Sequence, residues 1–230
     1  MIKTALILAH NRPKETRDVV AAIYPQVDYL LVIDNASEPP VHEWFTHEER
    51  VQYPQMWIVR DMTQPANLPR LWNIGFSQIE MMLYSTVGLN PGPYKIAVLT
   101  DDVQIPEGWM NAVCDAMDRT GAAAGCSSPW NSHLVQELLK REPDSDIMNR
   151  MFGPAFVLRG EANLRADENL KWWWNDTDLD WQARGAGGMV VIPTHPVVNL
   201  YPNASTVGVN AERAGVDREE FGAKWGWNPW

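Results

Sequence analysis

The stretch KIAVLTDDVQIPEGW, residues 95–109, sets a short apolar run directly before two adjacent acids, Asp101 and Asp102. Such a run is typical of a buried strand, and the acids stand where that strand should end. Neighbouring carboxylates repel each other, and neither can be buried without a partner. The stretch therefore predicts a strand that brings two carboxylates to one edge of a sheet, where a positive group must meet them.

Outward from this stretch, short apolar runs alternate with helical patterns. We expect strands at 4–9, 29–34, 55–61, 95–100, 122–128, 151–160, 188–193 and 195–200, and helices at 12–24, 69–83, 107–121 and 175–187. The alternation predicts an α/β fold with a mostly parallel central sheet flanked by helices. Ligands of such sheets bind beyond the carboxyl ends of the strands, which is where Asn11, Asp34 and the acid pair fall. After about residue 127 the pattern loosens, so we expect a single domain with a looser C-terminal half.

Composition limits the function. The 230 residues carry a formal net charge of −10, which disfavours nucleic acid as the main partner because phosphate binding needs a basic surface. No segment has the apolar length of a membrane span, and we expect a cytoplasmic protein. Two cysteines, Cys114 and Cys126, form neither a disulfide framework nor a metal motif, and we expect buried free thiols.

The acid pair has two interpretations. Acids after a strand often only start a turn, but Asp101 and Asp102 stand several residues before the next helix begins. Adjacent carboxylates favour a divalent cation, Mg²⁺ or Mn²⁺, which commonly binds together with substrate phosphates. His195, between two late strands, is either a structural residue or a third ligand of that cation.

Three further segments carry candidate site residues. In NDTDLDWQAR, residues 175–184, the acids either complement a helix dipole or include a catalytic base. In NLPRLWNIG, residues 67–75, the first residue suits a helix N-cap, and the arginine suits either a diphosphate or the surface. Trp172, Trp173 and Trp174 cannot all face one core, so at least one should lie in a cleft or on the surface.

In order, these segments resemble the inverting GT-A glycosyltransferases of the family-2 type, which transfer a sugar from a nucleoside-diphosphate donor. The similar segments are AHNRP (9–13), VIDNAS (32–37), NLPRLWNIG (67–75), LTDDV (99–103), WNDTDL (174–179) and PVVNLYPNAST (196–206). The resemblance covers about residues 3–206. It implies a Rossmann-like GT-A fold with a nucleotide-sugar half, residues 1–126, and an acceptor-side half with a C-terminal tail, residues 127–230.

The resemblance also implies roles for individual residues. Asp102 would be the main ligand of Mn²⁺ or Mg²⁺, with Asp101 as a helper and His195 as the third ligand. Asp176 would be the catalytic base, with Asp178 as the second choice. The donor would contact Ala9, Asn11, Asp34, Asn67, Arg70, Asn73 and Asp101, and the acceptor would contact Gly153, Trp172, Trp173 and Trp174.

The sequence departs from the family pattern in two places. Leu200 and Tyr201 stand where the family often has a metal-binding histidine before the tail, and Asn175 replaces the usual glutamate before the base. The expected function is metal-dependent transfer of a sugar to a hydroxyl of a glycan, protein or small molecule. The alternatives are a module that binds a sugar nucleotide or glycan without turnover, and a glycosyltransferase acting on a modified DNA base.

Overall fold

The computed structural model describes residues 1–88, 91–146, 148–201 and 209–226. The strands are β1 Ile2–Ala9, β2 Tyr29–Asn35, β3 Met56–Asp61, β4 Tyr94–Thr100, β5 Val103–Gln104, β6 Ala124–Cys126, β7 Leu138–Lys140, β8 Ala155–Arg159, β9 Met189–Val191 and β10 Val198–Asn199. The α-helices are α1 Pro13–Ile23, α2 His47–Gln52, α3 Leu68–Val87, α4 Trp109–Thr120, α5 Asn175–Gly185 and α6 Val209–Trp225.

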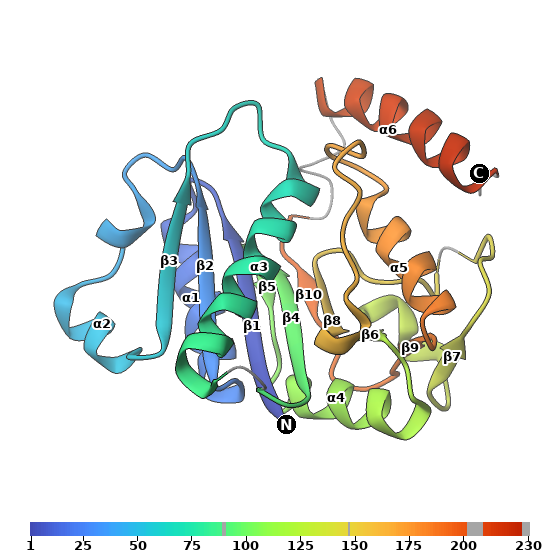
Figure 1. The fold of residues 1–230 in the computed structure, drawn as a ribbon, viewed down its shortest axis with the longest axis horizontal. Coiled ribbons are helices and arrows are strands. Elements are labelled where there is room, and N and C mark those ends of the chain that lie inside the picture. Colours follow the sequence, from blue (N-terminus) through green and yellow to red (C-terminus); the bar gives the residue numbers. More distant parts are fainter. Residues whose placement is uncertain (89–90, 147, 202–208, 227–230) are drawn as a thin grey trace.

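One twisted sheet holds eight of these strands, in the order β3-β2-β1-β4-β8-β6-β9-β7 (Figure 1). The first four are parallel to one another, whereas β8 runs antiparallel to both β4 and β6. This arrangement confirms the predicted α/β fold with a mostly parallel sheet. The two late strands do not pair with each other: β9 lies beside β6 in the main sheet, and β10 pairs with β5 in a separate ribbon.

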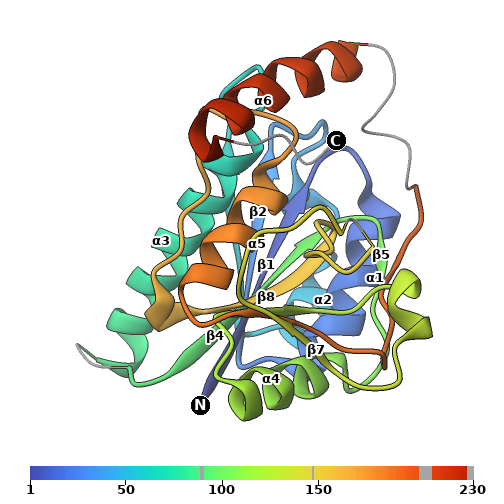
Figure 2. The same ribbon diagram turned by 90° about the vertical axis from the view of Figure 1, so that its right-hand side faces the viewer.

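The central strands are largely apolar because helices cover both faces of the sheet. Figure 2 shows α3 on one side and α1 on the other. In β1, every residue from Thr4 to Ala9 is buried, as expected for a strand covered on both faces. The helix α3 begins where the sequence predicts, since the Asn67 side chain accepts a hydrogen bond from the backbone N–H of Arg70 at 3.0 Å.

Strand register brings three loops together at one edge. Ala9 at the end of β1 lies opposite Asp34 of β2, and Leu8 lies opposite Thr100 of β4. The residues that follow these strands therefore meet at the carboxyl edge, as in other sheets of this kind. The acid pair lies there, next to the segment that follows β1.

The helix α6 was not expected from the sequence. It packs against the region of α5, where Figure 1 shows it crossing the upper right of the molecule. The contact is a second apolar cluster, separate from the main core, formed by Leu170, Trp174, Trp181 and Phe221 with Trp173 and Trp225 packed against it.

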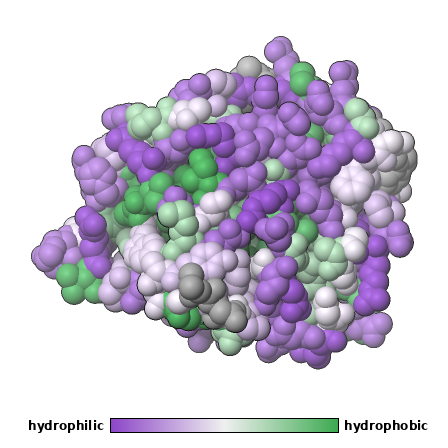
Figure 3. All heavy atoms as spheres, viewed as in Figure 1, coloured by the Kyte–Doolittle hydropathy of each residue, from purple (hydrophilic) through white to green (hydrophobic). Residues whose placement is uncertain are grey.

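The surface agrees with the charge of the chain. The face in Figure 3 is largely hydrophilic, with apolar side chains gathered in smaller areas. None of the helices in the described ranges combines the length and apolar character needed to cross a bilayer. Both cysteines are free and buried, which confirms the expectation from the sequence.

Candidate functional site

The positive partner of the acid pair is an arginine of this chain. Arg12 follows β1, and its Nη1 lies 3.0 Å from Oδ1 of Asp101 and 2.5 Å from Oδ2 of Asp102. The other carboxylate oxygens also accept hydrogen bonds, from the His10 backbone N–H at 2.8 Å and from the Thr100 hydroxyl at 2.7 Å. The two acids are only 5% and 6% exposed, so this network offsets the cost of burying them.

Burial and the neighbouring charges shift the pKa values in this network in opposite directions. Burial raises the pKa of Asp101 to about 6, although the His10 N–H and Arg12 favour the charged form. Burial alone would lower the pKa of Arg12, but the two carboxylates outweigh it and raise that pKa. Arg12 therefore stays charged, and Asp101 is the acid of the pair that holds a proton more readily than an exposed aspartate would.

The acid pair offers carboxylate oxygens of the kind that hold a divalent cation. Two carboxylates converge on one cationic nitrogen, Arg12 Nη1, which stands in for a metal ion. Mg²⁺ is usually held in this way, by one or two carboxylates plus substrate phosphates and water. Within the described ranges there is no cluster of three or more His, Cys, Asp or Glu able to hold a metal. The residues therefore fit a cation that takes its remaining ligands from a diphosphate and water.

The structure does not bring His195 into this group, which corrects the sequence-based ligand set. Its backbone carbonyl accepts a hydrogen bond from the Ser127 hydroxyl at 2.7 Å. Its ring lies over the start of α4, where Nε2 is 3.5 Å from the position a Cβ would take at Gly108. His195 thus packs beside α4 in a structural position. Tyr201 instead lies near the acids, with the Arg12 guanidinium 5.2 Å from its ring centre.

Asp176 lies close to the loop that precedes β8. Its carboxylate lies against Gly153, where a Cβ would fall 3.0 Å from the Asp176 Cγ and would collide with Oδ2. Thr100, at the end of β4, donates its backbone N–H to Pro154 O at 3.0 Å and so joins this loop to the strand that carries the acid pair. Oδ1 accepts the Thr177 N–H at 2.8 Å. Asp176 and Gly153, both predicted from the sequence, therefore meet.

Asp178 is not placed to act on a substrate. It is fully buried, and Lys224 Nζ lies 2.8 Å from its Oδ1. The indole N–H of Trp225 donates to the same oxygen at 2.9 Å, and the Gln182 amide donates to Oδ2 at 2.7 Å. The second candidate base is thus occupied by structural contacts, most of them from α6.

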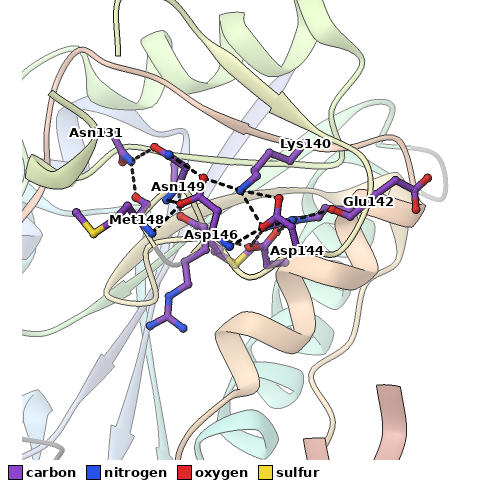
Figure 4. Close-up of polar contacts among 12 residues, drawn as sticks. Asn131, Lys140, Glu142, Asp144, Asp146, Met148 and Asn149 are labelled. Atoms are coloured by element: carbon purple, nitrogen blue, oxygen red, sulfur yellow. Dashed lines mark hydrogen bonds and ion pairs between the residues drawn. The ribbon is translucent and has the colours of Figure 1, made fainter. Parts of the chain in front are cut away.

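A polar network fixes the loop that carries Gly153. Lys140 Nζ bonds to Asp144 at 3.0 Å and Asp146 at 3.2 Å, and Asp146 in turn caps the turn that ends at Asn149 (Figure 4). Arg184 of α5 bonds to Asp144 at 3.2 Å. The polar stretch after residue 140 is therefore tied to α5, which sets Gly153 against Asp176.

The three tandem tryptophans lie in different surroundings, as expected from the argument that they cannot all face one core. Trp174 has a left-handed backbone with φ of 68°, is 5% exposed, and packs on Phe221 with ring centroids 5.1 Å apart. Trp172 and Trp173 are partly exposed, and Asp217 of α6 accepts both of their backbone N–H groups at 2.6 and 2.7 Å. Trp174 at least is a core residue, which corrects its assignment to the acceptor.

Sequence reasoning missed two residues at this edge. Arg12 was visible in the AHNRP segment, but its charge was not connected with the acid pair. Trp130 is 49% exposed and stacks edge-to-face on Phe152, next to Gly153, with ring centroids 6.0 Å apart. The sequence signal for Trp130 is a tryptophan in the short turn that follows β6, which ends at Cys126.

The helix start at residues 67–75 makes structural contacts. Arg70 Nη1 bonds to Asp61 at 2.8 Å. The side-chain amide of Asn67 donates to Glu168 O at 3.0 Å, and that of Asn73 donates to Ala166 O at 2.9 Å. The two asparagines fasten α3 to the segment before α5, and Arg70 ties it to the end of β3. A contact of Asn67, Arg70 or Asn73 with a donor stays a prediction.

Side-chain hydrogen bonds organise the loops that follow β1 and β2. Asp34 is 1% exposed and accepts the backbone N–H groups of Ser37 at 2.8 Å and Val41 at 3.1 Å. Asn11 accepts the Glu38 N–H at 2.8 Å, and Ala9 is buried at the strand end. Asp34 shapes the loop after β2, and its contact with a nucleotide stays a prediction. The end of the similar tail, residues 202–206, lies outside the described residues.

Comparison with known proteins identifies the type of fold. No family model and no curated protein sequence matches the chain. Among solved structures, residues 1–349 of S. aureus TarS match 99% of this chain, which spans 72% of that one, with a TM-score of 0.63 and 10% identity. The chain has a GT-A-like fold.

Two more structures of the same glycosyltransferase agree. TarS 1–349 in complex with UDP matches with a TM-score of 0.62 and 10% identity over 99% of this chain and 72% of that one. A further TarS structure gives 0.60 and 11% identity over 99% of this chain and 44% of its own length. At this level of identity the likeness establishes the architecture, and the chemistry has to be argued from the residues.

Proposed function

We propose that the protein is a glycosyltransferase that moves a sugar from a nucleoside-diphosphate sugar to an acceptor hydroxyl. The observation that carries this proposal is the position of Asp176. Its carboxylate lies against Gly153, in the loop that the Thr100 N–H joins to the end of β4, and the acid pair follows Thr100 directly. The shared fold with TarS, one structure of which contains UDP, supports a nucleotide-sugar donor.

On the donor side, residues 1–126 would bind the nucleotide sugar, with Ala9, Asn11 and Asp34 at the ends of the first two strands. Asp101 and Asp102 would hold Mn²⁺ or Mg²⁺ together with the diphosphate. When bound, such a cation neutralises the charge that develops on the leaving diphosphate.

On the acceptor side, residues 127–230 would present the hydroxyl of a glycan, protein or small molecule. Asp176 accepts the proton of that hydroxyl while the hydroxyl oxygen forms a bond to the anomeric carbon of the donor sugar. At the same time the bond from that carbon to the diphosphate breaks. The attack comes from the face opposite the leaving group, so the sugar's configuration inverts in one displacement. The backbone N–H of Thr177 holds Oδ1 of Asp176, which leaves Oδ2 to take the proton.

The variant Asp176→Asn tests this function, because it keeps the shape and removes the proton acceptor. We expect transfer to fall by roughly two to four orders of magnitude, with little change in donor affinity. Sugar transfer from a panel of nucleotide sugars and calorimetric binding of the matching nucleoside diphosphate measure the two effects. Asp178→Asn is the contrast variant and should instead lower the melting temperature, because its carboxylate pairs with Lys224.

Two results would contradict the proposal. Wild-type transfer by Asp176→Asn would show that another group is the base. Donor binding by the wild-type protein, with no transfer to any acceptor tried, would favour a module that binds sugar nucleotides without turnover.

A further inference from the structure

We propose that Arg12 competes with the divalent cation for Asp101 and Asp102, and that it binds the donor's diphosphate once the cation has displaced it. The inference rests on the proposed function, because it concerns how that donor is bound. Arg12 thus has two successive partners. It binds the acid pair in the donor-free protein and the diphosphate in the protein that holds the cation and the donor.

The first part follows from where the guanidinium lies. A single nitrogen, Nη1, contacts both carboxylates, at 3.0 Å from Asp101 and 2.5 Å from Asp102. A cation held by both acids would have to occupy that same place. One positive charge offsets only one of two negative charges, so a divalent ion gains more from the pair than Arg12 does.

The second part follows from the hydrogen-bond donors of Arg12 that have no partner among the described residues. A guanidinium has five N–H donors, and its fork suits two phosphate oxygens. Across the described residues, Nε and Nη2 of Arg12 make no hydrogen bond, and the side chain is 33% exposed. Arg12 therefore keeps donors available at the place where the proposed diphosphate meets the acid pair.

The surroundings of Arg12 allow it to change partners without leaving the site. The guanidinium lies over the ring of Tyr201, whose hydroxyl donates to Glu15 of α1 at 3.1 Å. The neighbouring Leu200 N–H donates to the Asp102 carbonyl oxygen at 2.9 Å. The aromatic ring is thus fixed at the acid pair by its own contacts, and it can face the guanidinium whichever anion Arg12 binds.

The inference predicts that one substitution raises the affinity for Mn²⁺ and lowers the affinity for a nucleoside diphosphate. In Arg12→Gln the acid pair has no counter-charge, so it should bind Mn²⁺ in the absence of nucleotide about tenfold more tightly than wild type. The same variant lacks the fork for phosphate oxygens, so at saturating Mn²⁺ it should bind a nucleoside diphosphate about tenfold more weakly. A residue with only a structural role would not separate the two affinities in this way.

The experiment measures Mn²⁺ binding by electron paramagnetic resonance, and then the binding of UDP, GDP, ADP, CDP and dTDP by calorimetry at saturating Mn²⁺. Arg165→Gln is the matched control, since Arg165 is 35% exposed, pairs with Glu80 and lies over the Phe76 ring. It should leave both affinities unchanged. Arg12→Lys keeps the charge and loses the fork, so it should keep wild-type Mn²⁺ affinity and lose affinity for the diphosphate. If Arg12→Gln does not fold, Arg12→Met tests the competition, because it also lacks the counter-charge, and Arg12→Lys tests the contact with the diphosphate.

Each outcome has a distinct meaning. Mn²⁺ affinity that is unchanged or lower in Arg12→Gln overturns the competition. Unchanged nucleoside-diphosphate affinity in Arg12→Gln and Arg12→Lys overturns the contact with the diphosphate. If the wild-type protein binds none of the five nucleotides at saturating Mn²⁺, the proposed function fails, and this inference fails with it.

Discussion

Gly153 controls the position of the proposed base, because it leaves space that the Asp176 carboxylate fills. In Gly153→Ala the new methyl would collide with Oδ2 of Asp176 and turn the carboxylate away from the sheet edge. We expect transfer to fall roughly tenfold to a hundredfold, the usual effect of a small displacement of a catalytic group, while nucleoside-diphosphate affinity stays the same. Steady-state transfer kinetics and calorimetry measure the two quantities.

A matched substitution separates this effect from a general effect of adding a methyl group. Gly222→Ala lies on α6, where a Cβ meets no atom within 4 Å, and it should leave transfer unchanged. Full transfer activity in Gly153→Ala would mean that Asp176 does not need its present position.

Individual residues show where sequence reasoning succeeds and where it fails. The pattern WNDTDL offered both Asp176 and Asp178 as the base, and nothing in it told a partly exposed acid from a buried one. That difference depends on Lys224 and Trp225, which reach Asp178 from a helix distant in sequence. The acid pair likewise required a positive partner, and only the register of β1 with β4 identified it as Arg12.

Among the elements, α6 is held by Asp217 in addition to its apolar cluster and its bonds to Asp178. This carboxylate is 2% exposed and accepts three backbone N–H groups, those of Lys171, Trp172 and Trp173, at 3.1, 2.6 and 2.7 Å. Asp217→Ala leaves these donors without their acceptor and should lower the free energy of unfolding by roughly 3 kcal/mol. Urea denaturation measures the change.

Glu220→Ala is the control on the same helix, since Glu220 is exposed, and it should leave the unfolding free energy nearly unchanged. Equal stability of Asp217→Ala and wild type would show that the apolar cluster alone holds α6.

Element prediction was accurate where the local pattern is strong. The runs that form β1, β2 and β4 are buried on both faces, and α3 and α4 have a recognisable N-cap and C-cap respectively, at Asn67 and Gly121. The helix α6 has no such pattern: in its described part, few apolar side chains face the protein, and Phe221 is its fully buried one. It is stabilised by tertiary contacts with α5, which a local pattern does not contain.

At the scale of the whole molecule, packing determines the chemistry of both thiols. Burial raises the pKa of Cys114 to about 11 and that of Cys126 to about 12. Thiolate is the reactive form, so we expect neither cysteine of the native protein to react with a thiol reagent at pH 8, and both to react in denaturant. Titration with Ellman's reagent counts them. Rapid reaction of either thiol in the native protein would show that its part of the core opens readily.

The fold as a whole followed from the sequence, because alternating apolar runs and helices permit few arrangements. The site followed in part. The strand ends correctly placed the acid pair at the carboxyl edge of the sheet, whereas the surroundings of Trp174, Asp178 and His195 depended on contacts between segments far apart in the chain.

The partners of Asp178 have a consequence for synthesis. The indole that bonds to this buried carboxylate belongs to Trp225, 47 residues later in the chain. On the ribosome, the strands that carry the acid pair emerge first and can pair with one another while the chain is still growing. The carboxylate of Asp178 is made well before Lys224 and Trp225, and until they are translated it lacks the cation that compensates its burial. The α5 region therefore matures last, and a ribosome that stalls before residue 224 holds a chain in which Asp178 has no counter-charge.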